Sequence, residues 1–99
     1  MKNNFFQFLG LAKRAGKTLE GYNKCEDGIK RGRVFLILLS SSVSKNTLDK
    51  FKNYAEKFNV PIIENIDEDK LSKSIGASVI KVLGISDENI SKKLINIWK

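Results

Sequence analysis

The stretch that decides the fold is VFLILL, residues 34–39, six apolar residues in a row. The run is too short for a buried helix and is typical of a central strand that is covered on both faces. The preceding residues, 21–33, spell GYNKCEDGIKRGR and predict a glycine turn that opens a basic helix over about Tyr22–Arg31, with Gly32 at its end. Such a helix beginning presents free backbone N–H groups, which suit a phosphate or the edge of a base.

Upstream of this stretch, apolar residues follow the 3.6-residue period of an amphipathic helix. Asn3 or Asn4 is predicted to cap this helix, and Gly16 to end it. A short extended piece, Lys17–Glu20, then leads to the glycine turn at Gly21. The apolar residues of the predicted helix are Phe5, Phe8, Leu9, Ala12 and Ala15.

Downstream of the strand, helix and strand patterns alternate. The predicted segments are a helix capped by Ser42 or Ser44 and closed by Asn59, a strand at Pro61–Glu64, a helix opened by Asp67, Glu68 and Asp69 and stopped by Gly76, a strand at Val79–Ile85, and a last helix capped by Ser86. This alternation indicates helices on both faces of a parallel or mixed sheet. We therefore expect an α/β fold, a three-layer α/β/α sandwich with a mixed sheet of about four strands, formed by residues 1–99 as one domain.

Positive charge is concentrated near the beginning of the chain. Residues 1–33 contain eight Lys or Arg against three acids, whereas residues 34–99 contain ten Lys against eight acids. A cation-rich third suits a polyanionic partner. The alternative interpretation of these lysines is solubility.

The residue inventory argues against several classes of site. Cys25 is the only cysteine, and the chain has no histidine, so we expect no disulfide, no metal site and no imidazole base for a nucleophile. Cys25 is predicted to be a half-buried helix residue. No apolar run approaches the ~20 residues of a membrane-spanning helix, and the N-terminus lacks the apolar region of a signal peptide. We expect a cytoplasmic monomer with no cofactor and no membrane partner.

GLAKRAGKT, residues 10–18, is superficially similar to a phosphate-binding P-loop. That motif requires four residues between its glycines, because successive N–H groups must wrap the phosphate. Here five residues separate Gly10 from Gly16, and they belong to an amphipathic helix. Nucleotide hydrolysis is therefore not expected, and no other residue is assigned a catalytic role.

The start of the basic helix permits two interpretations. Asn23 and Glu26 fit a capping box, with Asn23 at the N-cap, but Asn23 could also contact a ligand. Lys24 and Asp27 lie three residues apart and are predicted to pair on the surface. Together with Arg31 they share one polar face, which is either a solvated face or a binding surface.

The second candidate site is the small-residue segment Gly76-Ala77-Ser78-Val79. A tight loop of this composition between a helix and a strand could pack against an extruded base. It could equally be an ordinary connection.

The order of these segments resembles the L7Ae family of kink-turn-binding ribosomal proteins, and most of all its short bacterial YlxQ branch. The likeness extends over nearly the whole chain. It is carried by FLGLAKRAGKTLEG, IKRGRVFLILLSSSVSKNTLDKF, NVPII, LSKSIG and VIKVLGISD. The resemblance implies a non-catalytic α/β/α domain that binds structured or ribosomal RNA.

The resemblance also implies particular RNA contacts. In kink-turn binders of the family, a Gly-x-Asn-Glu-x-x-Lys segment opens the second helix and enters the bent RNA. Gly21 and Asn23 occupy the glycine and asparagine positions, Lys24 replaces the glutamate, Asp27 replaces the lysine, and Arg31 matches a basic position later in the helix. These changes leave RNA binding expected and kink-turn specificity altered.

The family's second contact, a loop that clamps an extruded base, corresponds to Gly76, Ala77, Ser78 and Val79. Arg14, Lys17 and Lys30 are expected to add electrostatic support. Two alternatives remain: an assembly adaptor that kept the fold and lost RNA recognition, and a detached substrate-binding part of an RNA-modifying enzyme.

Overall fold

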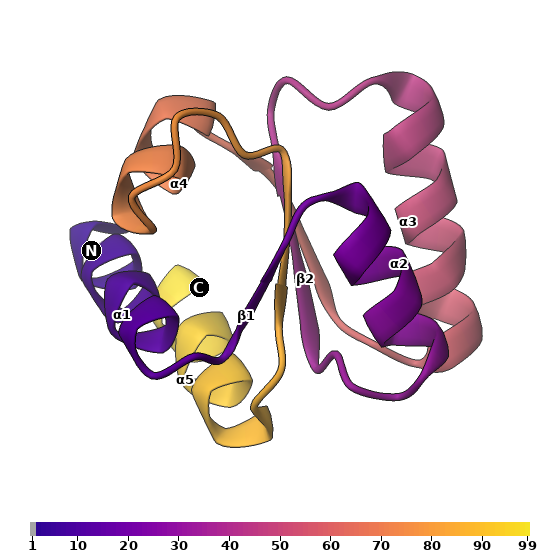
Figure 1. Ribbon diagram of the computed structural model, residues 1–99, viewed down its shortest axis with the longest axis horizontal. Helices are drawn as coiled ribbons and strands as arrows, with labels where there is room; N and C mark the ends of the chain where they lie inside the picture. Colours follow the sequence, from indigo (N-terminus) through magenta and orange to yellow (C-terminus); the bar gives the residue numbers. More distant parts are fainter. Residues whose placement is uncertain (1) are drawn as a thin grey trace.

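A computed structural model of the chain describes residues 2–99, with side chains described from Asn4 onwards. A four-stranded sheet stands between two layers of helices, which lie left and right of it in Figure 1. In chain order the elements are α1 (Lys2–Arg14), β1 (Thr18–Glu20), α2 (Tyr22–Lys30), β2 (Leu36–Ser40), α3 (Lys45–Phe58), β3 (Ile62–Ile66), α4 (Glu68–Ser74), β4 (Val82–Ile85) and α5 (Glu88–Trp98).

The sheet has the strand order β1-β4-β2-β3 and is mixed, as predicted. β2 pairs with β3 in parallel, whereas β4 runs antiparallel to both β1 and β2. β1, β2 and β3 therefore point the same way, and β4 returns between β1 and β2. At one end of the sheet β1, β2 and β3 finish and β4 begins, and at the other end β1, β2 and β3 begin and β4 finishes.

β2 is buried on both faces, which confirms the interpretation of the apolar run for Leu36–Leu39, whereas Val34 and Phe35 precede the strand and Phe35 is exposed. Leu36 and Leu38 belong to the core beneath α1, α4 and α5, while Ile37 and Leu39 belong to the core beneath α2 and α3. Because successive side chains of a strand point to opposite faces, a strand between two helix layers needs apolar residues at every position. The three-layer sandwich is thereby confirmed (Figure 1).

Gly28 lets α2 lie close to the sheet. A Cβ atom at this position would lie 2.6 Å from Leu19 Cδ1 and 2.9 Å from Val34 Cγ2. Contacts this short do not occur between real side chains, so only glycine fits without movement of its neighbours. The absence of a side chain at residue 28 thus sets the distance between α2 and the sheet.

Two predicted helix starts are wrong. Asn3 and Asn4 both lie inside α1, which already includes Lys2. Asp87, and not Ser86, is the N-cap of α5, where its Oδ2 accepts a hydrogen bond of 2.8 Å from Ile90 N. The backbone N–H of Ser86 instead donates to the carbonyl of Lys17 across the sheet end, so the helix begins one residue later.

Other helix ends follow the predictions. Ser44, one of two predicted candidates, caps α3 by accepting from Thr47 N, and Asn59 closes that helix in the left-handed conformation with φ 57°. Asp67 caps α4 by accepting from Lys70 N. Residues 10–14 lie within α1, which confirms that the stretch after Gly10 is helical and does not form a P-loop.

The strand bounds are shifted relative to the predictions. β3 covers Ile62–Ile66 and not Pro61–Glu64, because Pro61 has no N–H to donate and contributes only its carbonyl, which accepts from Ile37 N. β4 begins at Val82, three residues later than Val79. The residues from Val79 to Lys81, which precede β4, form part of the candidate site.

Candidate nucleic-acid interface

A cleft of about 430 Å³ opens at the sheet end where β1 and β2 finish and β4 starts. It lies between the start of α2, the β2–α3 loop and the segment before β4. We refer to it as the cleft. Its lining residues are Gly21, Tyr22, Val43, Ser44, Thr47, Val79, Ile80, Lys81 and Val82.

Gly21 joins the first strand to the start of α2 at the cleft. Its φ of 100° and ψ of 166° belong to a region that only glycine adopts readily, and it serves as the N-cap without any side-chain hydrogen bond. Its N–H donates to the carbonyl of Val82 at 2.9 Å, which ties the helix start to β4. One residue of each predicted half-site, Gly21 and Val79, therefore lines the same cleft.

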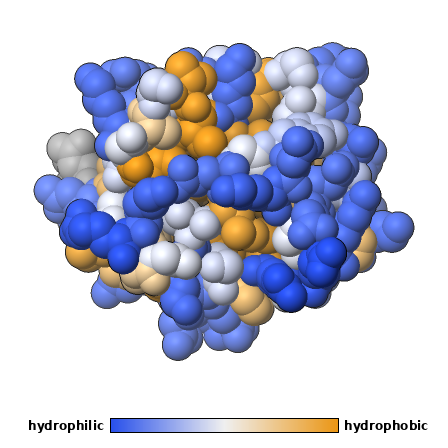
Figure 2. Space-filling model, in the orientation of Figure 1, coloured by the Kyte–Doolittle hydropathy of each residue, from blue (hydrophilic) through white to orange (hydrophobic). Residues whose placement is uncertain are grey.

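The segment before β4 presents an apolar surface next to Gly21. Val79 is 59% exposed, and Figure 2 shows hydrophobic atoms gathered over this segment on an otherwise largely hydrophilic face. The buried hydroxyl of Ser72 accepts from Ile80 N at 2.9 Å and holds the segment against α4. Gly76, Ala77 and Ser78 precede Val79 and do not line the cleft, although Gly76 ends α4 with φ 70°, as predicted.

Asn23 does not cap α2, so the predicted capping box is wrong. The positive φ of Gly21 starts the helix earlier and makes Tyr22 its first residue. Glu26 does not reach back, because its Oε2 accepts a hydrogen bond of 2.6 Å from the Tyr54 hydroxyl on α3. Asn23 is exposed in the first turn, where its side chain forms no hydrogen bond with any described residue.

The predicted pair between Lys24 and Asp27 is also wrong. Asp27 Oδ1 accepts from Arg31 Nε at 2.9 Å, in an exposed pair one helix turn apart. Arginine at i+4 reaches the carboxylate with better geometry than lysine at i−3. Within the part of the chain that the structure describes, Lys24 is therefore left without an ion pair, in the first turn of α2.

The remaining predicted cations lie away from the cleft. The carbonyl of Lys17 accepts from Ser86 N, which places Lys17 and the neighbouring Arg14 at the opposite end of β1, roughly 13 Å from Gly21 along the strand. Lys30 and Arg31 lie at the C-terminal end of α2, roughly 12 Å from its start. The structure thus groups the first turn of α2 with Val79 and separates these four cations from them.

Several residues of the cleft were not predicted from the sequence. Lys81 lines the cleft, is exposed, and forms no ion pair with a described residue. A single cation between Ile80 and Val82, at the start of a predicted strand, was the available signal. The contribution of Ser44 and Thr47 depends on the sheet order, which no local pattern reveals.

A polar network fixes α2 against α3 behind the cleft. The hydrogen bond from Tyr54, followed by the positive charges of Lys30 and Lys50, lowers the pKa of the Glu26 carboxyl. Lys50 Nζ lies 3.5 Å from Glu26 Oε2, and its hydrogen bond with Tyr22 raises the pKa of Lys50. Tyr22 also lines the cleft and packs edge-on against Phe51, so this network supports one cleft wall.

Cys25 is fully buried rather than half-buried. Its Sγ donates to the carbonyl of Leu19 at 3.2 Å, and burial raises the pKa of its thiol to about 12. A thiol of this kind packs as a small apolar side chain. Residues 2–99 contain no grouping of acidic, cysteine or histidine side chains that could hold a metal ion, and none of their helices is long and apolar enough to cross a membrane.

Known proteins share this sequence pattern. The sequence model of the ribosomal protein L7Ae/L30e/S12e/Gadd45 family matches residues 3–95. The chain is 31% identical over 93 residues to the RNA-binding protein YlxQ of Bacillus subtilis (strain 168), covering 94% of this chain and 93% of that protein. It is 32% identical over 85 residues to the RNA-binding protein YlxQ of Enterococcus faecium, covering 86% and 82%, respectively.

Solved structures share the fold. A protein with unknown function from Bacillus halodurans superposes with a TM-score of 0.91 at 28% sequence identity, with 94% of each chain covered. The 15.5 kD RNA-binding protein of Giardia lamblia superposes with a TM-score of 0.81 at 13% identity, covering 93% of this chain and 82% of that one. The second likeness concerns the fold alone.

Proposed function

The chain belongs to the ribosomal protein L7Ae/L30e/S12e/Gadd45 family, and we propose that it is a non-catalytic, single-domain protein that binds structured RNA through the cleft. The curated relatives named as RNA-binding proteins match almost the full length of the chain, which supports RNA as the partner. The observation that carries the proposal is the meeting of Gly21 and Val79 in one cleft.

The chemistry of the cleft suits a bent RNA with an unstacked base. The first turn of α2 offers backbone N–H groups and the exposed amide of Asn23 to base edges. Val79 and Tyr22 form an apolar wall against which an extruded base packs. Lys24 and Lys81 are the cations available to neighbouring phosphates.

Specificity is proposed to be relaxed relative to kink-turn binders of the family. Lys24 stands where those proteins have a carboxylate, and a cation adds phosphate affinity without reading a base. Loss of a carboxylate that accepts from a base removes ~1–3 kcal/mol of discrimination. Asp27 is engaged with Arg31, so neither residue replaces that contact. A ribosomal or ribonucleoprotein RNA whose bend is less strictly defined fits this site.

The test is a titration of the protein with a kink-turn RNA, an unkinked duplex and fragments of ribosomal RNA at two salt concentrations. We expect at least one structured RNA to bind more tightly than the duplex, with a log–log salt slope of about −0.7 to −0.9 for each phosphate contacted. Binding of all three RNAs at the same generic level would contradict the proposal and favour the adaptor interpretation.

Asn23→Ala separates recognition from stability. Because Asn23 caps nothing, its loss should leave the melting temperature unchanged while weakening binding of the preferred RNA by roughly 5- to 150-fold. The matched control is Asn53→Ala, an exposed asparagine on α3 outside the cleft lining. If the two variants bind alike, Asn23 does not contact RNA.

A further inference from the structure

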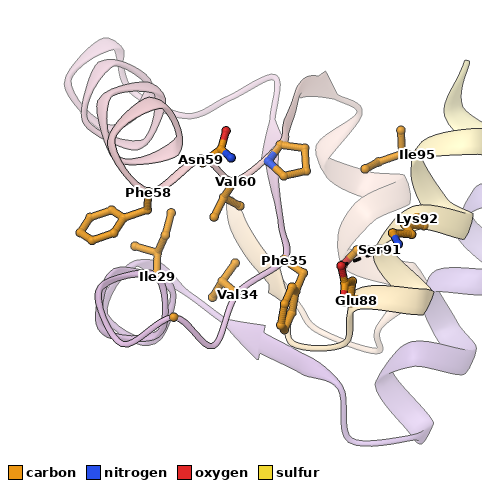
Figure 3. A pocket seen from close by; sticks show the side chains of 12 residues that line it. Ile29, Val34, Phe35, Phe58, Asn59, Val60, Glu88, Ser91, Lys92 and Ile95 are labelled. Carbon is orange, nitrogen blue, oxygen red and sulfur yellow. Dashed lines mark ion pairs between the residues drawn. The ribbon is translucent and has the colours of Figure 1, made fainter.

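A second cavity lies at the opposite end of the sheet from the cleft. It has a volume of about 370 Å³, within the size range of small-ligand sites, and we refer to it as the end pocket. Figure 3 shows side chains from α2, α3 and α5 facing one another around it. Its lining residues are Ile29, Gly32, Val34, Phe35, Phe58, Asn59, Val60, Pro61, Glu88, Ser91, Lys92 and Ile95.

The end pocket has an apolar floor and an aromatic rim. Ile29 and Val34 are buried at its base, while Phe35 is 36% exposed immediately before β2. The N–H of Phe35 donates to the carbonyl of Ile85 at 2.8 Å, so the backbone that carries this ring is fixed. An exposed, positioned aromatic ring beside an apolar cavity suits a flat ring system that stacks on it.

Ser91 supplies an unsatisfied polar group to this pocket. It is only 2% exposed, yet its Oγ forms no hydrogen bond within the part of the chain that the structure describes. Buried hydroxyls nearly always have a partner. Since Ser91 lines the pocket, a ligand with a hydrogen-bonding edge would complete it.

Positive charge surrounds the end pocket. The three segments that line it, residues 29–35, 58–61 and 88–95, contain five Lys or Arg and one acid. Arg31 and Lys92 are held by Asp27 and Glu88. Among described residues, Arg33 forms no ion pair, and it lies between two residues of the lining.

We propose that the end pocket is a second RNA site, which takes one unstacked nucleotide of a single-stranded segment. A nucleotide combines a flat ring for Phe35 and a hydrogen-bonding base edge for Ser91, both in the lining, with a phosphate for Arg33 next to the lining. An acidic peptide with an aromatic residue shares the charge and the ring. The relatives named as RNA-binding proteins favour the nucleotide. The inference extends the proposed function to the other end of the molecule.

The first test follows backbone amide signals of the isotopically labelled protein by NMR. Adenosine 5′-monophosphate should shift the amides of Phe35, Ser91 and Ile95, adenosine should shift the same set more weakly, and inorganic phosphate should leave Ser91 unchanged. Shifts confined to the cleft would overturn the inference. So would tighter binding at the pocket by the peptide Asp-Asp-Trp-Asp-Asp than by the nucleotide.

The second test compares variants for binding of a ten-nucleotide oligoadenylate. Phe35→Ala should weaken binding roughly 5- to 150-fold, because base–aromatic stacking is lost. Ser91→Ala should weaken it less and leave the fold intact, since no protein partner is lost, and Arg33→Gln should reduce the salt slope by about 1. Leu11→Ala and Lys70→Gln, an exposed apolar residue on α1 and an exposed cation on α4, are the matched controls.

The two sites can fail independently. Lys81→Gln should weaken binding of the preferred structured RNA and leave oligoadenylate binding unchanged, whereas Phe35→Ala should do the reverse. Loss of structured-RNA binding in both variants would assign all RNA contacts to one continuous surface and overturn a separate end pocket. Equal oligoadenylate affinity in Phe35→Ala and Leu11→Ala would overturn it as well.

Discussion

The cleft and the end pocket occupy opposite ends of one sheet and are built differently. The cleft is bounded by loops and the start of α2, and Gly21 contributes only backbone to it. The end pocket is bounded by helix ends and side chains, with buried Ser91 on its lining. The difference follows from strand direction, because chain turns lie where β1 and β2 finish and helix ends lie where β2 begins.

The two ends also differ in charge. The cleft-lining segments, residues 21–22, 43–47 and 79–82, contain Lys45 and Lys81 and no acid. Lys45 pairs with Asp49 at 3.4 Å, which leaves Lys81 as the cation of the lining outside an ion pair among described residues. The end with the predicted recognition residues therefore carries fewer cations than the opposite end. In the proposed RNA complex, the region of highest positive charge and the residues proposed to contact base edges therefore lie at different ends of the sheet.

The largest effect expected concerns Cys25, a buried residue of α2. With its pKa raised to about 12, the thiol is protonated at pH 8, and burial blocks reagents as well. We expect native Cys25 to react with a disulfide reagent at least on the order of a thousand times more slowly than in guanidinium chloride. Reaction at the unfolded rate would mean that α2 lifts from the sheet and joins the two cavities.

The next effect concerns Gly28, because a side chain at this position would contact Val34 of the end pocket but no residue of the cleft lining. Gly28→Ala would press on Leu19, whose terminal methyl can rotate away, and on buried Val34, whose branched side chain cannot. Overpacking of about 1–3 kcal/mol should exceed the ~1 kcal/mol that alanine gains in a helix, so urea denaturation should show a net loss of stability. Since Val34 lines the end pocket, oligoadenylate binding should weaken while structured-RNA binding persists. Higher stability of the variant would show that the side chain of Val34 moves to accommodate the added methyl group.

Two further glycines form a matched pair, one at each end. Gly21 has φ 100° and Gly32 has φ 73°, and a Cβ atom would meet nothing within 4 Å at either position. Alanine should therefore cost only backbone strain, about 1–3 kcal/mol at Gly21 and about 1–2 kcal/mol at Gly32, measured by thermal denaturation. Gly21→Ala should also weaken structured-RNA binding at temperatures where both variants are folded. Identical RNA affinities would remove the start of α2 from the interface.

The smallest effect expected is the pH dependence of the Tyr54–Glu26 contact, which supports the cleft and not the end pocket. Because the pKa of Glu26 is lowered in the folded state, its contribution to stability is present at neutral pH and disappears as the pH falls through that lowered value. Glu26→Gln should lower the melting temperature slightly at pH 7 and match the unaltered protein at acidic pH. Glu64→Gln, at an exposed pair with Lys52, is the control. A difference that persists at acidic pH would mean that shape rather than charge matters at residue 26.

Local patterns predicted the fold because each determinant lies within a few residues. The apolar run at 34–39 predicted a strand that is covered on both faces. Ser44, Asn59 and Asp67 mark helix ends through local interactions within one turn. The prediction failed at the start of α2, where two residues could each begin the helix. Asn23 resembles an N-cap, but the backbone of Gly21 already starts that helix.

The two segments of the candidate site were each predicted from the sequence, but their proximity in the fold was not. Gly21 and Val79 stand 58 positions apart, and only the insertion of β4 beside β1 brings them together. The end pocket was missed because Phe35 belongs to the apolar run, where every residue was interpreted as core. Its exposure follows from its place one residue before β2 begins.

The insertion of β4 has a consequence for synthesis of the chain. Thr18 pairs with Ile85, 67 positions later, and β4 is the strand that pairs with β1 in the described part of the protein. β2, α3 and β3 follow one another closely and can associate while later residues are still being added. β1 waits unpaired until residues 82–85 emerge from the ribosome, and the same event brings the carbonyl of Val82 to the N–H of Gly21. The proposed RNA site in the cleft therefore cannot form on a nascent chain before residues 82–85 are available to pair with β1.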